Sequence, residues 1–519
     1  MQRAETNTQS IYPHPFDRAS LLKQSSREKA IHELSIAFRD QPNWTEKLTD
    51  RTLFTAWLRQ SMKEIRKRDY IDPYNPRDTE LRPDDTKFLY SELSKYRRYV
   101  LKLREGEAKE GIEPDVDGVW RRDGILDENW RKKLVDATTT LENTPNKERG
   151  LPASGSKGFK SQVLDPDMYP FVYKKTLALE KDGKYFELAV PPPSKWWKGG
   201  YNPYASWLPS EFKIAKDGNS TKIVSYINNL TLPGQEALFH PIFEKVFTEF
   251  LPLFNHVLAD LAGKGCSRER SSKFECFDME DMPFFDSDEE EFNNPWTPPE
   301  IVSSRELEGK TVKIIVRLVE MNLAPRKSYI SNNSDWNVDG MGNERIVATG
   351  IYQYEQGNVK DYLVPFRQRD FYSFSGPDAM DDEFSYANVQ WKTRHNAATT
   401  MKGNRGIVFP NLYEHRLPSS LELVDRNKPG FVKLLIFHLC DPTIEDLPST
   451  RTVPPQQPGQ LEHLLRQTRA LGRLPEEIFQ LILSHVVGNI MTMKEASVFK
   501  GVLVSHKNNV LEGGLGQYR

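Results

Sequence analysis

The run KLLIFH at residues 433–438 decides the fold that the sequence predicts, because a short apolar run of this kind forms a buried strand. Two further runs precede it, IVATGIY at residues 346–352 and IVF at residues 407–409, and the first is rich in β-branched residues. Earlier still, alternating apolar positions are Val312, Ile314, Val316 and Leu318. Many short strands separated by glycine and proline turns predict a sandwich or jelly roll.

Helical patterns flank the predicted β core on both sides. Apolar residues recur at three- and four-residue steps between residues 43 and 103, and residues 125–150 have the pattern of a short helix. Residues 235–262 predict a strong helix, whose apolar side would contain Leu238, Ile242, Val246, Phe250 and Leu253. The predicted fold class is therefore α+β, a jelly-roll (cupin-like) core with helical N- and C-terminal regions.

The sequence predicts five parts. They are a flexible N-terminus (1–30), a mainly helical region with some strands (31–265), an acidic insertion (266–299), the jelly-roll core (300–450) and C-terminal helices (451–519). The insertion contains DSDEEE at residues 286–291, and such a block of like charges resists folding. It is interpreted as a solvated insertion, with binding of a basic partner as the alternative.

The composition narrows the function classes. The 519 residues carry a net charge of -2, so no overall field favours nucleic acid or a membrane surface. The three cysteines form no CxxC pair or disulfide framework, which suits a reducing compartment. No secretory signal or membrane-spanning apolar run is evident. The expected protein is soluble and cytoplasmic, or nuclear, with a small-molecule substrate and with neither nucleic acid nor membrane as a partner.

The motif WNVDG at residues 336–340 has the spacing of a metal site. Asp339 follows the potential ligand Asn337 by two positions, and His415 follows 76 positions later on another predicted strand. Non-haem iron(II) sites use two histidines and one carboxylate on one face of the metal and leave positions open for reactants. Asn337 stands where such a site needs a histidine, so the motif indicates an iron chemistry and also a divergence from it.

Plainer interpretations of both residues stay open. Asp339 precedes Gly340, and Asp-Gly pairs often shape a turn without binding anything. A lone histidine such as His415 is weak evidence for a ligand, because a hydrogen-bonded histidine at the rim of a barrel would look the same in the sequence.

Several segments are similar to a fungal family catalogued as domain of unknown function 4246. They are SYINNL at 225–230, GM at 340–341 with NE at 343–344, IVATGIY at 346–352, FRQ at 366–368, FPN at 409–411 with HR at 415–416, and KPG at 428–430. The resemblance runs over most of the chain. It implies a double-stranded β-helix of the iron(II)/2-oxoglutarate oxygenase class, with Fe(II) and 2-oxoglutarate as cofactors.

The resemblance also implies site residues. Asn337, Asp339 and His415 take the metal positions, although the family usually has histidine in place of Asn337. Val432 stands where an arginine would grip the cosubstrate carboxylate, and valine cannot do so. Cosubstrate-binding residues that would compensate are Arg367, Arg416 and His438. Lys433 is also a neighbour of Val432, but strand alternation points it to the opposite face.

Three hypotheses follow. The first is an iron(II)/2-oxoglutarate-dependent oxygenase-like protein that oxidises an unidentified small molecule. The second is a catalytically degenerate member of the fold that binds a small molecule or a protein, or runs a reaction without redox chemistry. The third is a scaffold that acts through its helical regions and its acidic insertion.

Overall fold

A computed structural model gives the fold. It describes residues 11–16, 34–65, 83–105, 111–116, 118–146, 148–149, 159–179, 183–188, 200–230, 234–262, 305–331, 336–373, 389–487 and 490–513, together with Leu151, Val190 and Leu232. The predicted acidic insertion, and the predicted flexible N-terminus apart from residues 11–16, lie outside this part of the chain.

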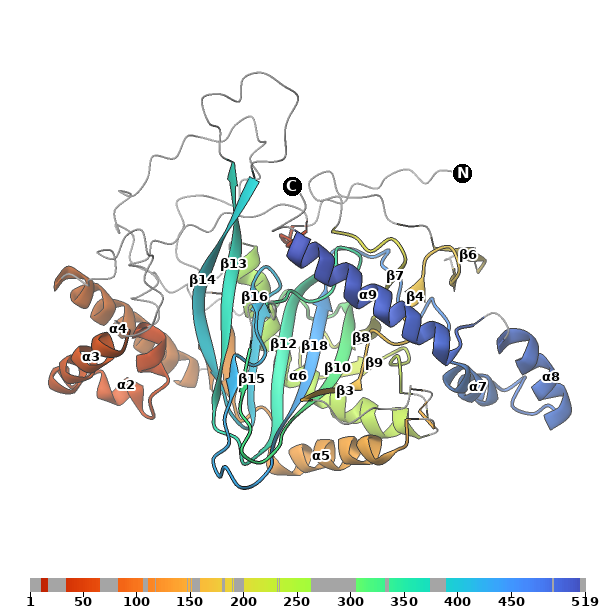
Figure 1. The fold of residues 1–519 in the computed structure, drawn as a ribbon, viewed down its shortest axis with the longest axis horizontal. Helices are drawn as coiled ribbons and strands as arrows, with labels where there is room; N and C mark the ends of the chain where they lie inside the picture. The colour runs from red at the N-terminus through yellow and green to blue at the C-terminus, as the bar shows by residue number, and fades with distance from the viewer. Residues whose placement is uncertain are drawn as a thin grey trace, which may run out of the picture.

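The described elements make a mixed α and β structure (Figure 1). The helices are α2 (Trp44–Lys47), α3 (Arg51–Ile65), α4 (Pro83–Glu105), α5 (Glu128–Asn143), α6 (Gln235–Leu261), α7 (Pro458–Gln467), α8 (Glu476–Val487) and α9 (Met493–Gly513). The first nine strands are β1 (Ile112–Pro114), β2 (Trp120–Asp123), β3 (Lys160–Leu164), β4 (Phe171–Val172), β5 (Leu177–Leu179), β6 (Tyr185–Glu187), β7 (Ala205–Ser206), β8 (Ser210–Ile214) and β9 (Thr221–Ile223). The remaining strands are β10 (Thr311–Leu323), β11 (Tyr329–Ile330), β12 (Ile346–Gly357), β13 (Tyr362–Ser373), β14 (Val389–Met401), β15 (Arg405–Pro410), β16 (Glu414–His415), β17 (Ser420–Leu421) and β18 (Gly430–Cys440).

A nine-stranded antiparallel sheet is the centre of the fold. Its order is β1-β2-β15-β12-β18-β10-β8-β9, and β3 pairs with β10 outside this path. The predicted strand at residues 433–438 is confirmed as part of β18, which lies between β12 and β10. Strands from the region 31–265 thus share one sheet with strands from the region 300–450, and the division into five parts stays a prediction.

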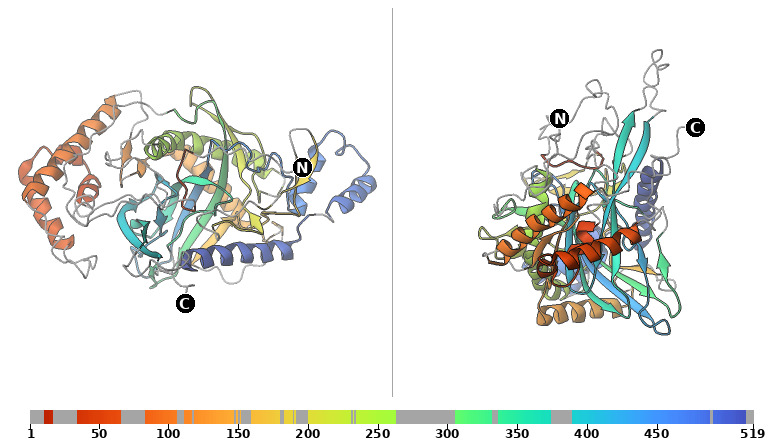
Figure 2. Two further views of the ribbon diagram at one scale, coloured as in Figure 1. Left: turned by 90° about the horizontal axis from the view of Figure 1, so that it is seen from above. Right: turned by 90° about the vertical axis from the view of Figure 1, so that its left-hand side faces the viewer.

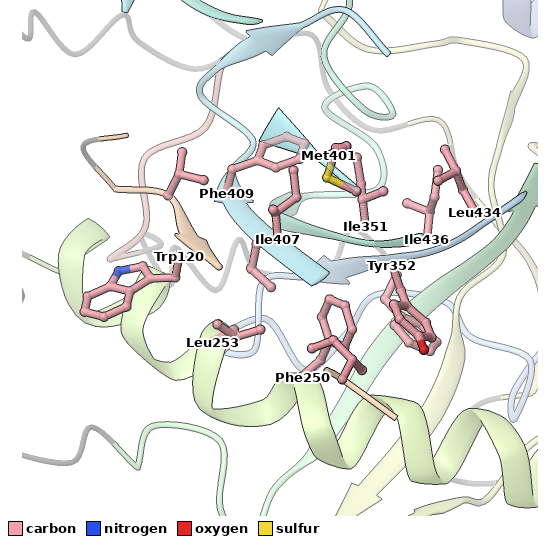
Figure 3. Packing of buried hydrophobic residues seen from close by; sticks show 14 of the residues in the cluster. Trp120, Phe250, Leu253, Ile351, Tyr352, Met401, Ile407, Phe409, Leu434 and Ile436 are labelled. Carbon is pink, nitrogen blue, oxygen red and sulfur yellow. The ribbon is translucent and has the colours of Figure 1, made fainter. Parts of the chain in front are cut away.

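Helix α6 covers one face of this sheet. The helix predicted over residues 235–262 is confirmed, and its side chains Ile242, Val246, Phe250 and Leu253 are buried. Leu238 departs from the predicted apolar side, because it is 42% exposed. Figure 3 shows Phe250 reaching the sheet near Tyr352, with the ring centroids 6.2 Å apart.

Close approach of α6 to the sheet requires a glycine. A Cβ atom added to Gly406 on β15 would lie 2.6 Å from Cζ of Phe250 and 2.7 Å from Cδ1 of Ile125. Such a contact is too short for any side chain, so the absence of a Cβ lets the helix pack directly on the strand.

Helix α9 lies over the opposite face of the nine-stranded sheet. Figure 1 shows it in front of the strands, and Figure 2 shows α6 and α9 on the two sides of the sheet in the view from above. Among the described helices, none combines the length and the apolar character needed to cross a membrane.

A three-stranded sheet, β14-β13-β16, packs on the same face as α9. Phe366 of β13 and His415 of β16 are cross-strand partners, and both rings lie 4.9 Å from the ring of Phe409 on β15. The long strands β13 and β14 were not among the predicted strands. The nine-stranded and the three-stranded antiparallel sheets therefore pack on each other, and closure into a jelly roll stays a prediction.

Lys433 lies on the α6 side of β18, opposite Val432, as strand alternation predicts. Its Nζ atom is 3.1 Å from Oε2 of Glu142 on α5 and 3.1 Å from Oε2 of Glu355 on β12. Burial alone would lower the pKa of Lys433, but the two glutamates outweigh burial and raise it above 10.5. The cation therefore ties α5 to the sheet.

Lys433→Met is expected to lower the free energy of unfolding by about 2 kcal/mol, because it leaves two carboxylates facing each other without their cation. Because the folded-state pKa of Lys433 is raised, the contribution is complete below pH 10.5 and declines as the pH rises through that raised value. Urea unfolding across this pH range measures it. Lys360→Met is the control, because Lys360 and Glu422 form an exposed pair; equal effects of the two substitutions would contradict the assignment.

Candidate functional site

Backbone pairing brings the two halves of the predicted metal motif together. The N–H of Asn337 donates to the carbonyl of His415 at 3.1 Å, and the N–H of His415 donates to the carbonyl of Asn337 at 2.9 Å. Residues that exchange both hydrogen bonds in an antiparallel pair have side chains on the same face. Asp339 is also on this side, with Oδ2 at 4.0 Å from Nε2 of His415.

The turn at Gly340 follows directly. Gly340 has φ of 67°, and a Cβ atom there would lie 2.7 Å from Cδ1 of Ile346. A glycine is therefore required on both conformational and steric grounds. Asp339 both precedes a turn and faces a histidine, so the plain interpretation of the Asp-Gly pair holds alongside the spatial one.

Asn411 holds the backbone that carries Asp339. Its Oδ1 accepts the N–H of Asp339 at 2.9 Å, and its Nδ2 donates to the carbonyls of Asp339 at 2.8 Å and Ile346 at 3.1 Å. Because Asn411 lies between β15 and β16, these bonds fix the Asp339 turn to the segment that leads to His415.

Asn411→Ala is expected to lower the free energy of unfolding by about 3 kcal/mol. The substitution removes three buried hydrogen bonds and leaves their backbone partners unpaired. Asn411→Asp is the matched variant, because it keeps the acceptor for Asp339 N–H and loses the two donated bonds. Chemical denaturation measures both, and an Asn411→Ala loss below about 1 kcal/mol would contradict the role given to Asn411.

Thr349 links Asp339 to a second histidine. Its hydroxyl donates to Oδ2 of Asp339 at 2.8 Å and lies 3.0 Å from Nδ1 of His438. A hydroxyl has one hydrogen, so Thr349 accepts from His438 and the proton of that neutral ring is on Nδ1. Thr349 on β12 and His438 on β18 are cross-strand partners, and both are fully buried.

Burial and charge set the protonation of this cluster. Burial alone would raise the pKa of Asp339, but His438, His415, Lys507 and Arg317 outweigh burial and hold it well below its usual range. Burial lowers the pKa of His438 to about 3 and also lowers the pKa of His415, although Asp339 opposes both shifts. Near neutral pH the cluster therefore has an ionised carboxylate and neutral imidazoles.

Two cations complete the surroundings of Asp339. Arg317 on β10 places a guanidinium nitrogen 4.0 Å from Oδ1 of Asp339. Lys507 on α9 adds a second positive charge, and burial lowers its pKa while Asp339 raises it. The indole of Trp207 lies 5.5 Å from the Arg317 guanidinium and 5.7 Å from Lys507 Nζ, measured to the ring centroid.

The other sequence-predicted residues lie elsewhere around the site. Arg367 and Arg416 place their guanidinium groups 4.4 and 4.3 Å from the ring centroid of Trp336, and Arg367 pairs with Glu414 at 2.5 Å. Glu414 and Arg416 neighbour His415 along the chain, so alternation points them away from its face. Binding of a cosubstrate by Arg367, Arg416 and His438 stays a prediction.

Val432 is buried on the His438 face of β18, opposite Met321. Six residues of strand separate it from His438, which is roughly 20 Å. Arg317, whose cross-strand partner Ile436 is two residues from His438, supplies the guanidinium next to Asp339 instead.

The predicted ligands Asn337, Asp339 and His415 can be compared with the ligands that a divalent metal ion prefers. Within the described ranges, no group of three His, Cys, Asp or Glu side chains has the spacing of a metal site. The predicted set instead contains one amide, Asn337, beside one carboxylate and one neutral imidazole. Nδ1 of His415 is buried and has no hydrogen-bond partner in the part of the chain that the structure describes. An oxygen-rich set with one imidazole suits a divalent cation in kind, although more weakly than two imidazoles would.

Comparison with protein families gives one match that covers most of the chain. The model of a family described as "Protein of unknown function (DUF4246)" matches residues 84–463, which include Asn337, Asp339 and His415. The chain belongs to this family. Helix α9 and Lys507 lie outside the segment of this DUF4246 chain that the family model covers.

Solved structures that resemble this DUF4246 chain do so at low similarity. One is a selenomethionine-labelled Fe(II)/α-ketoglutarate-dependent dioxygenase TqaL, at 8% identity and a TM-score of 0.29, covering 70% of this chain and 95% of that one. Another is IDO from Bacillus thuringiensis, at 8% identity and a TM-score of 0.27, covering 67% and 95%. A third is an oxidoreductase of the 2OG-Fe(II) oxygenase family from Burkholderia pseudomallei, at 9% identity and a TM-score of 0.24, covering 69% and 94%. No curated protein matches the chain.

Sequence reasoning missed four residues of the cluster, namely Arg317, Thr349, Trp207 and Lys507. The sequence could have indicated Arg317, because a basic residue within an otherwise apolar, buried strand needs a partner for its charge. Thr349, Trp207 and Lys507 had none, because their places depend on strand register and on where α9 crosses the sheet.

Proposed function

We propose that this chain is an iron(II)/2-oxoglutarate-dependent oxygenase-like protein with a diverged metal site, and that it oxidises a small molecule. The observation that carries the proposal is the 4.0 Å separation of Asp339 Oδ2 from His415 Nε2, with Asn337 paired to His415 on the same face. Asn337, Asp339 and His415 are the residues that would hold the metal. Iron(II), when bound with 2-oxoglutarate, would supply the activation of dioxygen.

The chain's own residues prepare the site in three ways. The Thr349 hydroxyl orients Oδ2 of Asp339, and His438 in turn fixes that hydroxyl. Burial keeps the His415 imidazole neutral, so that a ring nitrogen has a lone pair to offer. Asp339 is 2% exposed and His415 is 5% exposed, so surrounding side chains exclude bulk water from the carboxylate and the imidazole.

Anaerobic titration with Fe(II) and 2-oxoglutarate tests the proposal. The expected result is a weak visible charge-transfer band, followed by succinate release when air is admitted. His415→Ala is expected to weaken Fe(II) binding on the order of 100-fold or more, because it removes the only imidazole of the set. His485→Ala is the control, since His485 is exposed on α8. Absence of both the band and succinate with the wild-type protein would refute the proposal.

A second candidate function is a binding module, or an enzyme without redox chemistry, that keeps the site and has lost the metal. The observation in its favour is that Asp339 already has a hydrogen bond from Thr349 and two cations, Arg317 and Lys507, around it. A carboxylate neutralised in this way has less need of a metal ion.

Asn337→His separates the two candidates. If the wild-type site has lost its metal, the new imidazole is expected to create measurable Fe(II) binding where the wild type has none. If the wild type already binds Fe(II) as tightly as the Asn337→His variant, the degenerate interpretation is excluded.

A further inference from the structure

Two partly buried cations at the cluster have no hydrogen-bond acceptor within the described residues. The Arg317 side chain is 12% exposed, its closest carboxylate contact is the 4.0 Å approach to Asp339, and its Nε atom has no partner among the residues that the structure describes. Lys507 likewise makes no hydrogen bond within those residues and lies against the Trp207 ring. A buried donor left unpaired costs free energy, so Nε of Arg317 is expected to meet an acceptor in the functional state. Lys507, beside the same indole, is a second cation that this acceptor could contact.

The neighbouring acids already accept hydrogen bonds from other donors. Glu344 accepts hydrogen bonds from the Ser206 hydroxyl and from the N–H groups of Trp207 and Met341. Asp167 accepts from the Trp207 indole N–H at 2.7 Å. Oδ2 of Asp339 accepts from Thr349. Among the described residues none of these acids forms a hydrogen bond with Arg317 or Lys507, so both cations have donors left to offer where they meet the indole.

We propose that a small carboxylate ligand completes this cluster, held between Arg317 on β10 and Lys507 on α9 beside the Trp207 ring. The planar guanidinium matches a carboxylate with two parallel hydrogen bonds, and the ammonium group adds a point charge. The proposal deepens the proposed function and depends on it for the reaction, but the binding of the anion itself requires no metal.

The ligand would also connect α9 to the sheet. Near the C-terminal end of α9, Leu511 packs against Phe16, Val338 and Met341. In the first half of α9, Lys500 pairs with Asp165 at 2.5 Å. Val338 and Met341 flank the Asp339–Gly340 turn, so α9 contacts the site on both its charged and its apolar side. A carboxylate shared by Arg317 and Lys507 would therefore hold α9 closed over the site.

Calorimetry on the metal-free, full-length protein tests the proposal, with succinate, acetate and inorganic phosphate as probes. Succinate is expected to bind, and Arg317→Met and Lys507→Met are each expected to weaken its binding at least about 10-fold. Lys494→Met is the matched control, because Lys494 is exposed on the same helix. Acetate is expected to bind at the same residues more weakly than succinate does.

Two outcomes overturn the proposal. One is that the wild-type protein does not bind succinate, or that Arg317→Met and Lys507→Met, shown by circular dichroism to be folded, both bind it as the wild type does. The other is phosphate binding equal to succinate binding, since the site would then be a general anion site without preference for a carboxylate. Hydrogen exchange gives a second readout, because succinate is expected to slow exchange in α9 of the wild type but not of Lys507→Met.

Metal binding is measured separately from succinate binding. Mn(II) binding is expected to survive in Arg317→Met and Lys507→Met, because neither residue belongs to the proposed ligand set. Loss of succinate binding with retained Mn(II) binding therefore supports the carboxylate site. Failure of Mn(II) binding in the wild type refutes the metal site and leaves the calorimetric result on the anion intact.

Discussion

Asp339→Asn is expected to lower the affinity of the protein for Mn(II), a stand-in for Fe(II), by at least about 100-fold. The substitution keeps the shape of the side chain and removes the only carboxylate of the proposed ligand set. It also leaves Arg317 and Lys507 without their shared negative charge. Electron paramagnetic resonance of free Mn(II) measures the affinity directly, and Asp217→Asn at an exposed turn is the control.

Thr349→Val separates coordination from orientation. It keeps Asn337, Asp339 and His415 and removes only the hydroxyl that donates to Oδ2 of Asp339. A loss of about 10- to 100-fold in Mn(II) affinity is expected, which is smaller than the loss in Asp339→Asn. If Asp339→Asn binds Mn(II) as the wild type does, the metal is not held by this carboxylate and the proposed function fails.

Phe437→Ala is expected to lower the free energy of unfolding by about 4 kcal/mol. Phe437 on β18 is fully buried, and its ring centroid lies 5.5–6.4 Å from those of Phe212, Phe243, Phe247 and Phe250. Three of these rings belong to α6 and one to β8, so the truncation leaves a cavity where helix and sheet meet.

Urea denaturation measures the effect, with two comparisons. Phe437→Leu keeps most of the apolar volume and is expected to lose less than half as much stability as Phe437→Ala. Ile330→Ala is the surface control, because Ile330 is 74% exposed and its truncation is expected to change stability by no more than about 0.5 kcal/mol. A Phe437→Ala loss within the range of the surface control would contradict the packing described for α6.

The elements that the sequence predicts best are those with a strong period. Helix α6 and strand β18 were predicted because each is long or apolar enough to have one interpretation. Strands β13 and β14 were not predicted, since the FRQ segment at residues 366–368 was noted only as a motif. Their pairing depends on a partner strand distant in sequence, which the pattern of either strand alone does not specify.

The candidate site could be predicted only where a motif marks it. Asp339 and His415 were expected to approach each other, and they do. The link from Asp339 through Thr349 to His438 depends on the register of β12 against β18, which no local pattern encodes. Lys507 reaches the cluster because α9 folds back over the sheet, and the sequence of α9 alone does not predict this packing.

The position of β18 bears on the order in which the chain folds. β18 ends at Cys440 and lies between β12 and β10, so the sheet stays split until residues 430–440 have left the ribosome. β2 pairs with β15 and β8 pairs with β10, so both are synthesised long before these partners, and contacts of such sequence separation slow folding. Nascent chains that end before residue 430 are therefore expected to expose the apolar surface of α6 and to depend on chaperones until β18 is synthesised.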